Sequence, residues 1–175
     1  MARMRSEEVK EYRRIILDKI CHDDMLIDLL CTKEELKETP EEERYKLIPY
    51  KHCFPHDYTP IDESGNFLIN RYLNFEIQET VNKYNPTLKD VEVYFFAVCH
   101  QTQIKMSTTD LTCWYDEVAC IIDDLFGDSN FLGIGKLELV SNEPYRMSYA
   151  NQIPYKGRTL IFAVKDFTDG KKYGK

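Results

Sequence analysis

Residues 91–126 read VEVYFFAVCHQTQIKMSTTDLTCWYDEVACIIDDLF and contain the two strongest secondary-structure signals of the chain. The first part, 91–104, begins with apolar side chains on both faces of an extended chain, as in a central strand covered on both sides, and turns polar at His100. The second part, 111–126, predicts an amphipathic helix. Its apolar stripe consists of Leu111, Trp114, Val118, Ile121 and Leu125. Thr109 or Asp110 is expected to cap this helix, and Gly127 to end it.

Weaker patterns on either side of this stretch predict a first helix and further strands. Ser6, followed by two glutamates, marks the start of a helix of about 15 residues. Residues 71–79 alternate between apolar and polar side chains, as in a strand with one buried face. Two more strands are predicted at 137–140 and 159–164, with a turn at 142–144 and a short segment at 146–150 between them. These elements predict an α+β domain in which a mostly antiparallel sheet packs against one long amphipathic helix, 110–126.

The part of the chain between the first helix and the first strand differs in composition. A short apolar helix capped by Asp23 is expected over 25–30. Residues 33–46 are strongly charged, which favours a mobile surface excursion. Three prolines within 45–60 exclude a central strand or a helix there, so this tract is expected to run extended and to anchor through its aromatic side chains. The resulting prediction is one domain over 1–167, with an extended proline-aromatic excursion at 33–60 and a flexible basic tail at 168–175.

Composition excludes several classes of protein. The 175 residues are 43% hydrophobic and 13% aromatic, which is too rich for a disordered chain. The longest apolar run, 93–99, is far shorter than the roughly 20 residues that a membrane span needs. The charged start of the chain lacks the apolar region of a signal peptide. Six dispersed cysteines without such a signal indicate reduced thiols in a reducing cytosol.

The net charge of −7 is unevenly distributed along the chain. Residues 61–135 carry 4 basic and 12 acidic side chains, for a net charge of −8, whereas residues 136–175 carry 8 and 4, for +4. The acidic middle segment would repel a phosphate backbone, which disfavours a protein that grips DNA. Segments of opposite sign could steer subunits or partners toward each other, although an unevenly charged solvated surface explains them equally well.

Three short motifs resemble chemical sites, and each has a simpler structural explanation. His52 and His56 have the spacing of metal ligands on a helix, but nearby prolines deny a helix and no further Cys/His pair completes a tetrahedral site. Cys99 beside His100 suggests a nucleophile, yet no base or orienting residue is identifiable, and cysteine is often buried for packing alone. Residues 133–136 lack the hydroxyl residue and the following helix of a phosphate loop. We therefore expect no catalytic residue, no metal and no cofactor.

Several longer segments together match a known pattern. They are Pro49-Tyr50-Lys51…Phe54-Pro55, Arg71-Tyr-Leu-Asn-Phe-Glu-Ile77, Phe95-Phe96-Ala-Val-Cys-His100, Gly133-Ile-Gly-Lys-Leu137 and Gly157-Arg-Thr-Leu-Ile-Phe-Ala-Val-Lys-Asp166. This arrangement resembles the neck proteins of tailed bacteriophages, in particular the tail-terminator family, over roughly residues 10–167. The resemblance implies a small α+β subunit that assembles as a hexameric ring on the last ring of the tail tube. Such a ring ends tube polymerisation and joins the tail to the head connector.

The resemblance also implies partners, a location and surfaces. The partners would be other copies of the chain, the tail tube protein, a head–tail connector or stopper protein and, in contractile tails, the sheath protein. The location would be the virion neck, after assembly in the host cytoplasm, with DNA passing through without specific binding. The expected subunit or partner interface contains Tyr50, Phe54, Tyr58, Arg146 and Arg158, in a chain whose 12 tyrosines are typical of interfaces. Acids expected to face the lumen, where they would repel DNA, are drawn from Asp62, Glu63, Glu76, Glu79, Asp90 and Glu92.

Two other functions fit the sequence. A head-completion or adaptor protein, which would bind the portal side of the connector, belongs to the same structural class. A small cytosolic enzyme that uses Cys99 or His100 is the alternative from a different class. A native mass near six subunits would favour the terminator, whereas a monomer with a reactive thiol would favour the enzyme.

Overall fold

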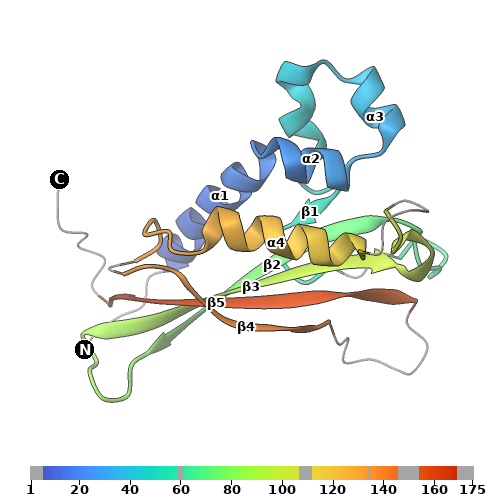
Figure 1. Ribbon diagram of the computed structural model, residues 1–175. Helices are drawn as coiled ribbons and strands as arrows, with labels where there is room; N and C mark the ends of the chain where they lie inside the picture. Colours follow the sequence, from blue (N-terminus) through green and yellow to red (C-terminus); the bar gives the residue numbers. More distant parts are fainter. Residues whose placement is uncertain (1–5, 59–60, 107–111, 134, 146–153, 169–175) are drawn as a thin grey trace.

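The chain folds around a single five-stranded sheet (Figure 1). The computed structural model describes residues 6–58, 61–106, 112–133, 135–145 and 154–168. The strands are β1 (Cys53–Phe54), β2 (Arg71–Val81), β3 (Leu88–His100), β4 (Glu138–Pro144) and β5 (Tyr155–Phe167), in the spatial order β1-β2-β3-β5-β4. β1 pairs in parallel with β2, and the other neighbours are antiparallel, so the sheet is mixed. The predicted α+β class is confirmed, and β3 is the central strand as expected.

Several helices, rather than one long helix, form the second layer. They are α1 (Ser6–Cys21), α2 (Asp24–Leu30), α3 (Lys33–Glu38) and α4 (Trp114–Phe126), with short 3-10 helices η1 (Glu41–Leu47) and η2 (Gln101–Gln103). α1, α2 and α4 lie on the same side of the sheet, and their apolar side chains share one core with β2, β3 and β5. α1 has 16 residues and α4 has 13, so α4 is not the longest helix. No helix in the described part of the chain is long and apolar enough to cross a membrane.

The apolar face of α4 differs from the predicted stripe. The helix begins at Trp114, with Cys113 rather than Thr109 or Asp110 at its N-cap, and it ends at Gly127 as expected. Its buried residues are Trp114, Val118, Ala119, Ile122 and Phe126, whereas Ile121 and Leu125 are only partly buried. Trp114 and Val118 are thus buried as predicted. In the second half of the helix the buried face lies one residue further along than predicted, because Phe126 packs against Phe95 of β3 with 4.8 Å between ring centroids.

The strands agree with the predictions in their cores and differ at their ends. In β2, Leu73, Phe75 and Ile77 are buried in the core as predicted. β3 stops at His100, where η2 begins. Its second face is less covered than expected, since only a small aromatic cluster packs there. The predicted turn at 142–144 is wrong: these residues belong to β4 and pair with β5. Residues 146–150 and Leu111 lie outside the described residues.

The excursion at 33–60 contains more regular structure than predicted. Residues 33–46 form α3 and most of η1, and α3 starts with a reciprocal capping box between Thr32 and Glu35. The prolines exclude a central strand, but β1 lies at the sheet edge between Pro49 and Pro55, where a short strand is permitted. Of the predicted basic tail, only Thr168 is described. It is buried, and its backbone N–H donates to the carbonyl of Thr87.

A buried ion-pair network fixes the start of α1 to the sheet. Lys89 of β3 is fully buried, and its ammonium group pairs with Glu8 of α1 and with Glu79 of β2 at 2.7 Å. Asp166 of β5 lies 3.8 Å from the same nitrogen and accepts a hydrogen bond from the hydroxyl of Tyr12. One cation thus connects three strands to α1, an arrangement that the sequence analysis did not identify.

Candidate functional site

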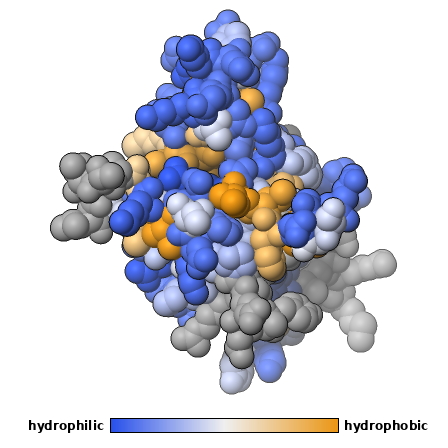
Figure 2. All heavy atoms as spheres, turned by 90° about the vertical axis from the view of Figure 1, so that its right-hand side faces the viewer, coloured by the Kyte–Doolittle hydropathy of each residue, from blue (hydrophilic) through white to orange (hydrophobic). Residues whose placement is uncertain are grey.

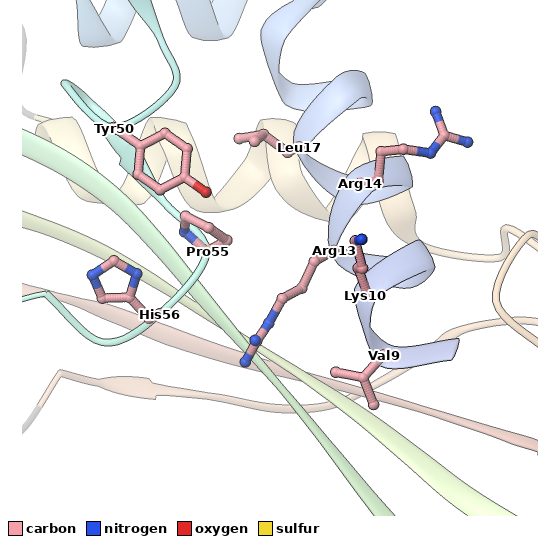
Figure 3. A pocket seen from close by; sticks show the side chains of 8 residues that line it. All are labelled: Val9, Lys10, Arg13, Arg14, Leu17, Tyr50, Pro55 and His56. Carbon is pink, nitrogen blue, oxygen red and sulfur yellow. The ribbon is translucent and has the colours of Figure 1, made fainter. Parts of the chain in front are cut away.

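The candidate site is a groove of about 660 Å³ between α1 and the turn that contains β1 (Figure 3). Val9, Lys10, Arg13, Arg14 and Leu17 line it from α1, and Tyr50, Pro55 and His56 line it from the turn. β1 is short and pairs only with Leu73 and Asn74 of β2. The rest of this edge of β2 has no strand partner among the described residues, and the groove lies beside it. We refer to these eight residues as the basic groove.

Two of the three cations in the basic groove already have acidic neighbours. The Arg13 guanidinium pairs with Glu76 of β2, and Arg14 pairs with Glu11 one turn earlier on α1, at 2.7 Å. Arg13 Nε is buried and has no hydrogen-bond partner in the described part of the chain. Cations, apolar stems and an aromatic rim suit a partner surface that is acidic and apolar. The eight lining residues include no Ser or Cys nucleophile.

Tyr50 stands at the rim of the basic groove in a strained conformation. Its φ of 57° lies in the left-handed region, which costs a residue other than glycine about 1–3 kcal/mol. The turn holds it there, since the Tyr50 N–H donates to the Cys53 carbonyl and Ile48 O accepts from Cys53 N–H. The side chain is nevertheless 65% exposed. A strained turn that presents an aromatic ring to solvent is a feature of binding surfaces.

The other expected interface residues are distributed over different parts of the molecule. Phe54 stacks on Tyr58 at 3.8 Å between ring centroids, and both pack against Tyr72 on the face of the sheet opposite the helices. Phe54 is thereby buried inside the subunit. Arg158 pairs with Asp116 near the start of α4 at 2.7 Å. Arg146 lies outside the described residues.

The acids expected at a lumen occupy both faces of the sheet. By strand alternation, Asp90 and Glu92 point away from the helices. Glu76 pairs with Arg13 of α1, and Glu79 points toward the helices and pairs with Lys89. Asp62 and Glu63 are exposed in a turn before β2. Hydrogen bonds from the backbone of Asn66 and its neighbours lower the pKa of Asp62. Because Glu79 is buried in an ion pair, its carboxylate does not face a lumen in the arrangement proposed below.

An acidic surface lies at the opposite edge of the sheet. Its carboxylates, from the end of α4 and the start of β4, are Asp123, Asp124, Asp128 and Glu138, around a depression of about 610 Å³. Of these four side chains, only Asp128 has an ion-pair partner in the described part of the chain, Lys136 at 3.3 Å. β4 itself is an exposed edge strand. We refer to these four carboxylates as the acidic edge.

The segment before β2 carries exposed hydrophobic side chains. Ile61, Phe67, Leu68 and Ile69 are all exposed, with Ile69 the most exposed at 63%. Figure 2 shows hydrophobic side chains gathered across the middle of the end of the molecule that lies to the right in Figure 1, bordered by hydrophilic ones. Exposed apolar surface of this kind commonly marks a protein contact.

The motifs that suggested chemistry are separated by the fold. Burial raises the pKa of the Cys99 thiol to about 12, despite the nearby Arg71, so this thiol is a poor nucleophile. His100 contacts the hydroxyl of Thr102 at 2.8 Å. Gly133 allows a close approach to β5, since a methyl group there would lie 2.5 Å from the carbonyl oxygen of Lys165.

His52 and His56 point to different places. His56 lines the basic groove, whereas His52 is buried beside Cys31 and Glu35, a combination of residue types that can hold a metal ion. Its members come from three different segments, so no local spacing in the sequence indicates this cluster.

Comparison with known proteins gives one match. No curated protein and no solved structure matches the chain. The model of one protein family, described as YomW, matches residues 8–164, which include nearly all of the sheet and its helical layer. The name of this family is that of a Bacillus phage-derived protein, which indicates a phage origin. Because the match extends over most of its length, the chain belongs to the YomW family.

Proposed function

We propose that the protein is a structural protein of the phage neck. In this role it forms a ring at the end of the tail tube, ends the growth of the tube and joins the tail to the head connector. The phage origin of the family name and the resemblance to tail terminators support the class of protein. The observation that carries the proposal is the placement of two different surfaces of opposite charge at opposite edges of one sheet.

Two such surfaces favour a ring over a two-fold dimer. A two-fold contact uses the same surface of both subunits, so it would join the basic groove to the acidic edge only if both lay on one surface, and they lie at opposite edges of the sheet. A head-to-tail contact instead places the acidic edge of one subunit against the basic groove of the next, and repetition of this contact closes a ring when the rotation per subunit is a whole fraction of a full turn. The surfaces complement each other beyond charge, because Tyr50 borders the groove and Val140 is 57% exposed on β4 beside the acidic edge.

Charge would set the orientation of this contact more than its strength. Exposed ion pairs contribute little to the free energy of association, but complementary potentials steer encounter and suppress wrong pairings. Arg13 and Arg14 would exchange or share their present partners with carboxylates of the neighbouring subunit. Apolar contacts of Val9, Leu17 and Tyr50 would supply the buried area.

The remaining surfaces would serve the other contacts of a neck ring. The exposed hydrophobic segment 67–69 would meet the tail tube protein or the connector protein. The exposed acids Asp62 and Glu63, with Asp90 and Glu92 on the outer face of β3, would line the path of the DNA without binding it. In this proposal the protein has no catalytic role.

Charge reversal tests the proposed contact. We expect a purified wild-type chain, alone or with tube ends, to give a closed ring near six subunits by native mass spectrometry and negative-stain microscopy. Lys10→Glu with Arg14→Glu should prevent assembly, and so should Asp123→Lys with Asp124→Lys. The chain that carries all four changes should assemble again, because the charges are exchanged. Glu41→Lys with Glu42→Lys, on exposed η1, is the matched control and should assemble normally.

The same variants separate the two neck roles. In phage particles, loss of a terminator ring should give tail tubes of uncontrolled length, whereas loss of a head-completion protein should leave tails of normal length without heads. Only monomers and two-fold dimers of the wild-type chain, both free and with tube ends, would contradict the ring.

A further inference from the structure

A buried cluster of three metal-ligand types lies where α2 and α3 meet the turn before β1. Cys31 follows the last residue of α2, Glu35 lies in the first turn of α3, and His52 precedes β1. One ligand atom from each lies within 4.8 Å of the other two. His52 Nε2 is 3.1 Å from one carboxylate oxygen of Glu35 and 3.2 Å from the other. Three segments of the chain thus bring sulfur, oxygen and nitrogen ligands to one point.

The cluster is shielded from water. The exposed fractions are 7% for Cys31 and 1% for His52, and 18% for the side chain of Glu35. Burial of polar groups is costly unless they are satisfied. His52 Nδ1 is buried and has no hydrogen-bond partner in the described part of the chain. The ring nitrogen that faces Glu35 is Nε2, so Nε2 is the ligand atom that this imidazole offers.

The backbone holds each of the three residues in place. The Cys31 N–H donates to Ile27 O at 3.0 Å, as the capping bond of α2. Glu35 belongs to the capping box of α3, in which its carboxylate accepts from the backbone N–H of Thr32 at 2.7 Å. His52 is anchored on both sides, since its N–H donates to Ile48 O and its carbonyl accepts from Leu73 of β2. Preorganised ligands lower the entropic cost of binding an ion.

Glu35 already has the protonation state of a metal ligand, whereas Cys31 has to lose a proton to an incoming ion. Burial opposes ionisation of Glu35, but hydrogen bonds from Lys51, from the Thr32 backbone and from His52 outweigh it and lower the pKa of Glu35 to about 2. Its carboxylate is thus ionised at neutral pH. Burial and the nearby Glu35 raise the pKa of the Cys31 thiol to about 11, so a bound ion would displace the thiol proton. Lys51 pairs with Glu35 from outside, is about half exposed and could turn into solvent when an ion takes its place.

We propose that Cys31, Glu35 and His52 form a zinc site that holds the end of α2 and the start of α3 against the turn before β1. A mixed set of thiolate, carboxylate and imidazole ligands is typical of Zn²⁺, and three protein ligands leave a fourth position for water. Tetrahedral bonds of about 2.0–2.3 Å place ligand atoms roughly 3.3–3.7 Å apart. The His52–Glu35 pair is already close to this spacing, so the Cys31 side chain needs only a small shift. The site is independent of the proposed neck function.

The test uses the full-length chain without a histidine tag. After incubation with Zn²⁺ and removal of the excess, elemental analysis should find zinc equimolar with the chain. Co²⁺ in its place should give the near-ultraviolet charge-transfer band of a cobalt–thiolate bond. The melting temperature should rise with added Zn²⁺, since the ion binds only the folded chain. Cys31→Ser should abolish the charge-transfer band and equimolar binding, and His52→Gln should abolish equimolar binding.

Buried cysteines outside the cluster provide the matched controls. Cys21→Ser and Cys53→Ser remove equally buried thiols and should leave zinc binding unchanged. If Cys31→Ser fails to fold, Glu35→Gln, on the surface side of the cluster, provides the same test. Substoichiometric zinc in the wild-type chain after exposure to excess ion would overturn the proposal, and so would equal binding by wild-type and Cys31→Ser chains.

Discussion

Replacement of Lys89 by methionine is expected to be the most damaging single change in the sheet. The carboxylates of Glu8, Glu79 and Asp166 all lie within ion-pair distance of the Lys89 ammonium. In the described part of the chain, none of them pairs with another cation. Methionine keeps an unbranched apolar side chain, one heavy atom shorter, and removes the ammonium group with its charge and its hydrogen bonds. The variant therefore leaves the carboxylates close together in a buried place, without the group that neutralised them.

The magnitude follows from the burial of the network. Removing one partner of a buried ion pair costs about 3–5 kcal/mol, because an uncompensated charge stays behind. This is a large part of a typical free energy of unfolding of about 5–15 kcal/mol. For a chain of this length it corresponds to a fall in melting temperature of about 6–20 °C. The change also loosens the start of α1, which carries Val9 and Lys10 of the basic groove.

The pH dependence gives the prediction a second readout. Burial lowers the pKa of Lys89, but its hydrogen bonds to Glu79 and Glu8 outweigh this effect, so the net pKa is raised. Its stabilising contribution is thus complete below the ordinary lysine pKa and is lost only as the pH rises through the raised value. In Lys89→Met, mutual repulsion should raise the carboxylate pKa values instead. Protonation of these carboxylates relieves their repulsion in the folded variant, and this relief is lost as the pH rises. The loss in free energy of unfolding relative to the wild type should therefore be smaller at pH 5 than at pH 7.

Urea and thermal unfolding, followed by circular dichroism at both pH values, measure these effects. Lys83→Met, which removes an exposed lysine from the same hairpin, is the matched control and should stay within about 0.5 kcal/mol of the wild type. The additional change Glu79→Gln should restore part of the stability lost in Lys89→Met. A Lys89→Met chain within about 1 kcal/mol of the wild type at pH 7 would refute the reasoning, since it would show that the network is not a buried ion-pair cluster.

Three further changes test the core, a close contact and the proposed lumen. Trp114→Ala should lower the free energy of unfolding by about 3–5 kcal/mol, and an unchanged melting temperature with loss of assembly would instead make Trp114 an interface residue. Gly133→Ala should cost about 1–3 kcal/mol, because the added methyl group meets the carbonyl of Lys165; a wild-type urea midpoint would contradict this. Asp62→Lys with Glu63→Lys should slow DNA ejection from phage particles without changing assembly or tail length, and ejection at the normal rate would place these acids elsewhere.

Local sequence patterns were sufficient to predict those helices and strands whose conformation depends on neighbouring residues. The alternation in 71–79 predicted β2, and the start of α1 and the end of α4 at Gly127 were found from capping residues. These features depend on backbone sterics, capping groups and the periodicity of apolar side chains, all of which are present in the sequence itself. The α+β class followed from the order of such elements.

Tertiary packing decided the features that depend on partners distant in the chain. The second half of the α4 stripe is shifted by one residue because the position of β3 determines which helical residues are buried. Residues 142–144 form a strand because they pair with β5. β1 forms because β2 lies beside it.

The candidate sites depend entirely on such distant contacts. Lys89 meets a glutamate 81 residues earlier, and His52 meets one 17 residues earlier. The basic groove and the acidic edge likewise combine segments that are separate in the sequence. Periodicity and capping indicate which side of an element is buried, but they do not indicate which other element will cover it. The sequence by itself therefore determined the longer helices and strands and the fold class, while only the folded structure determined which side chains meet, because that depends on how the helices and strands pack.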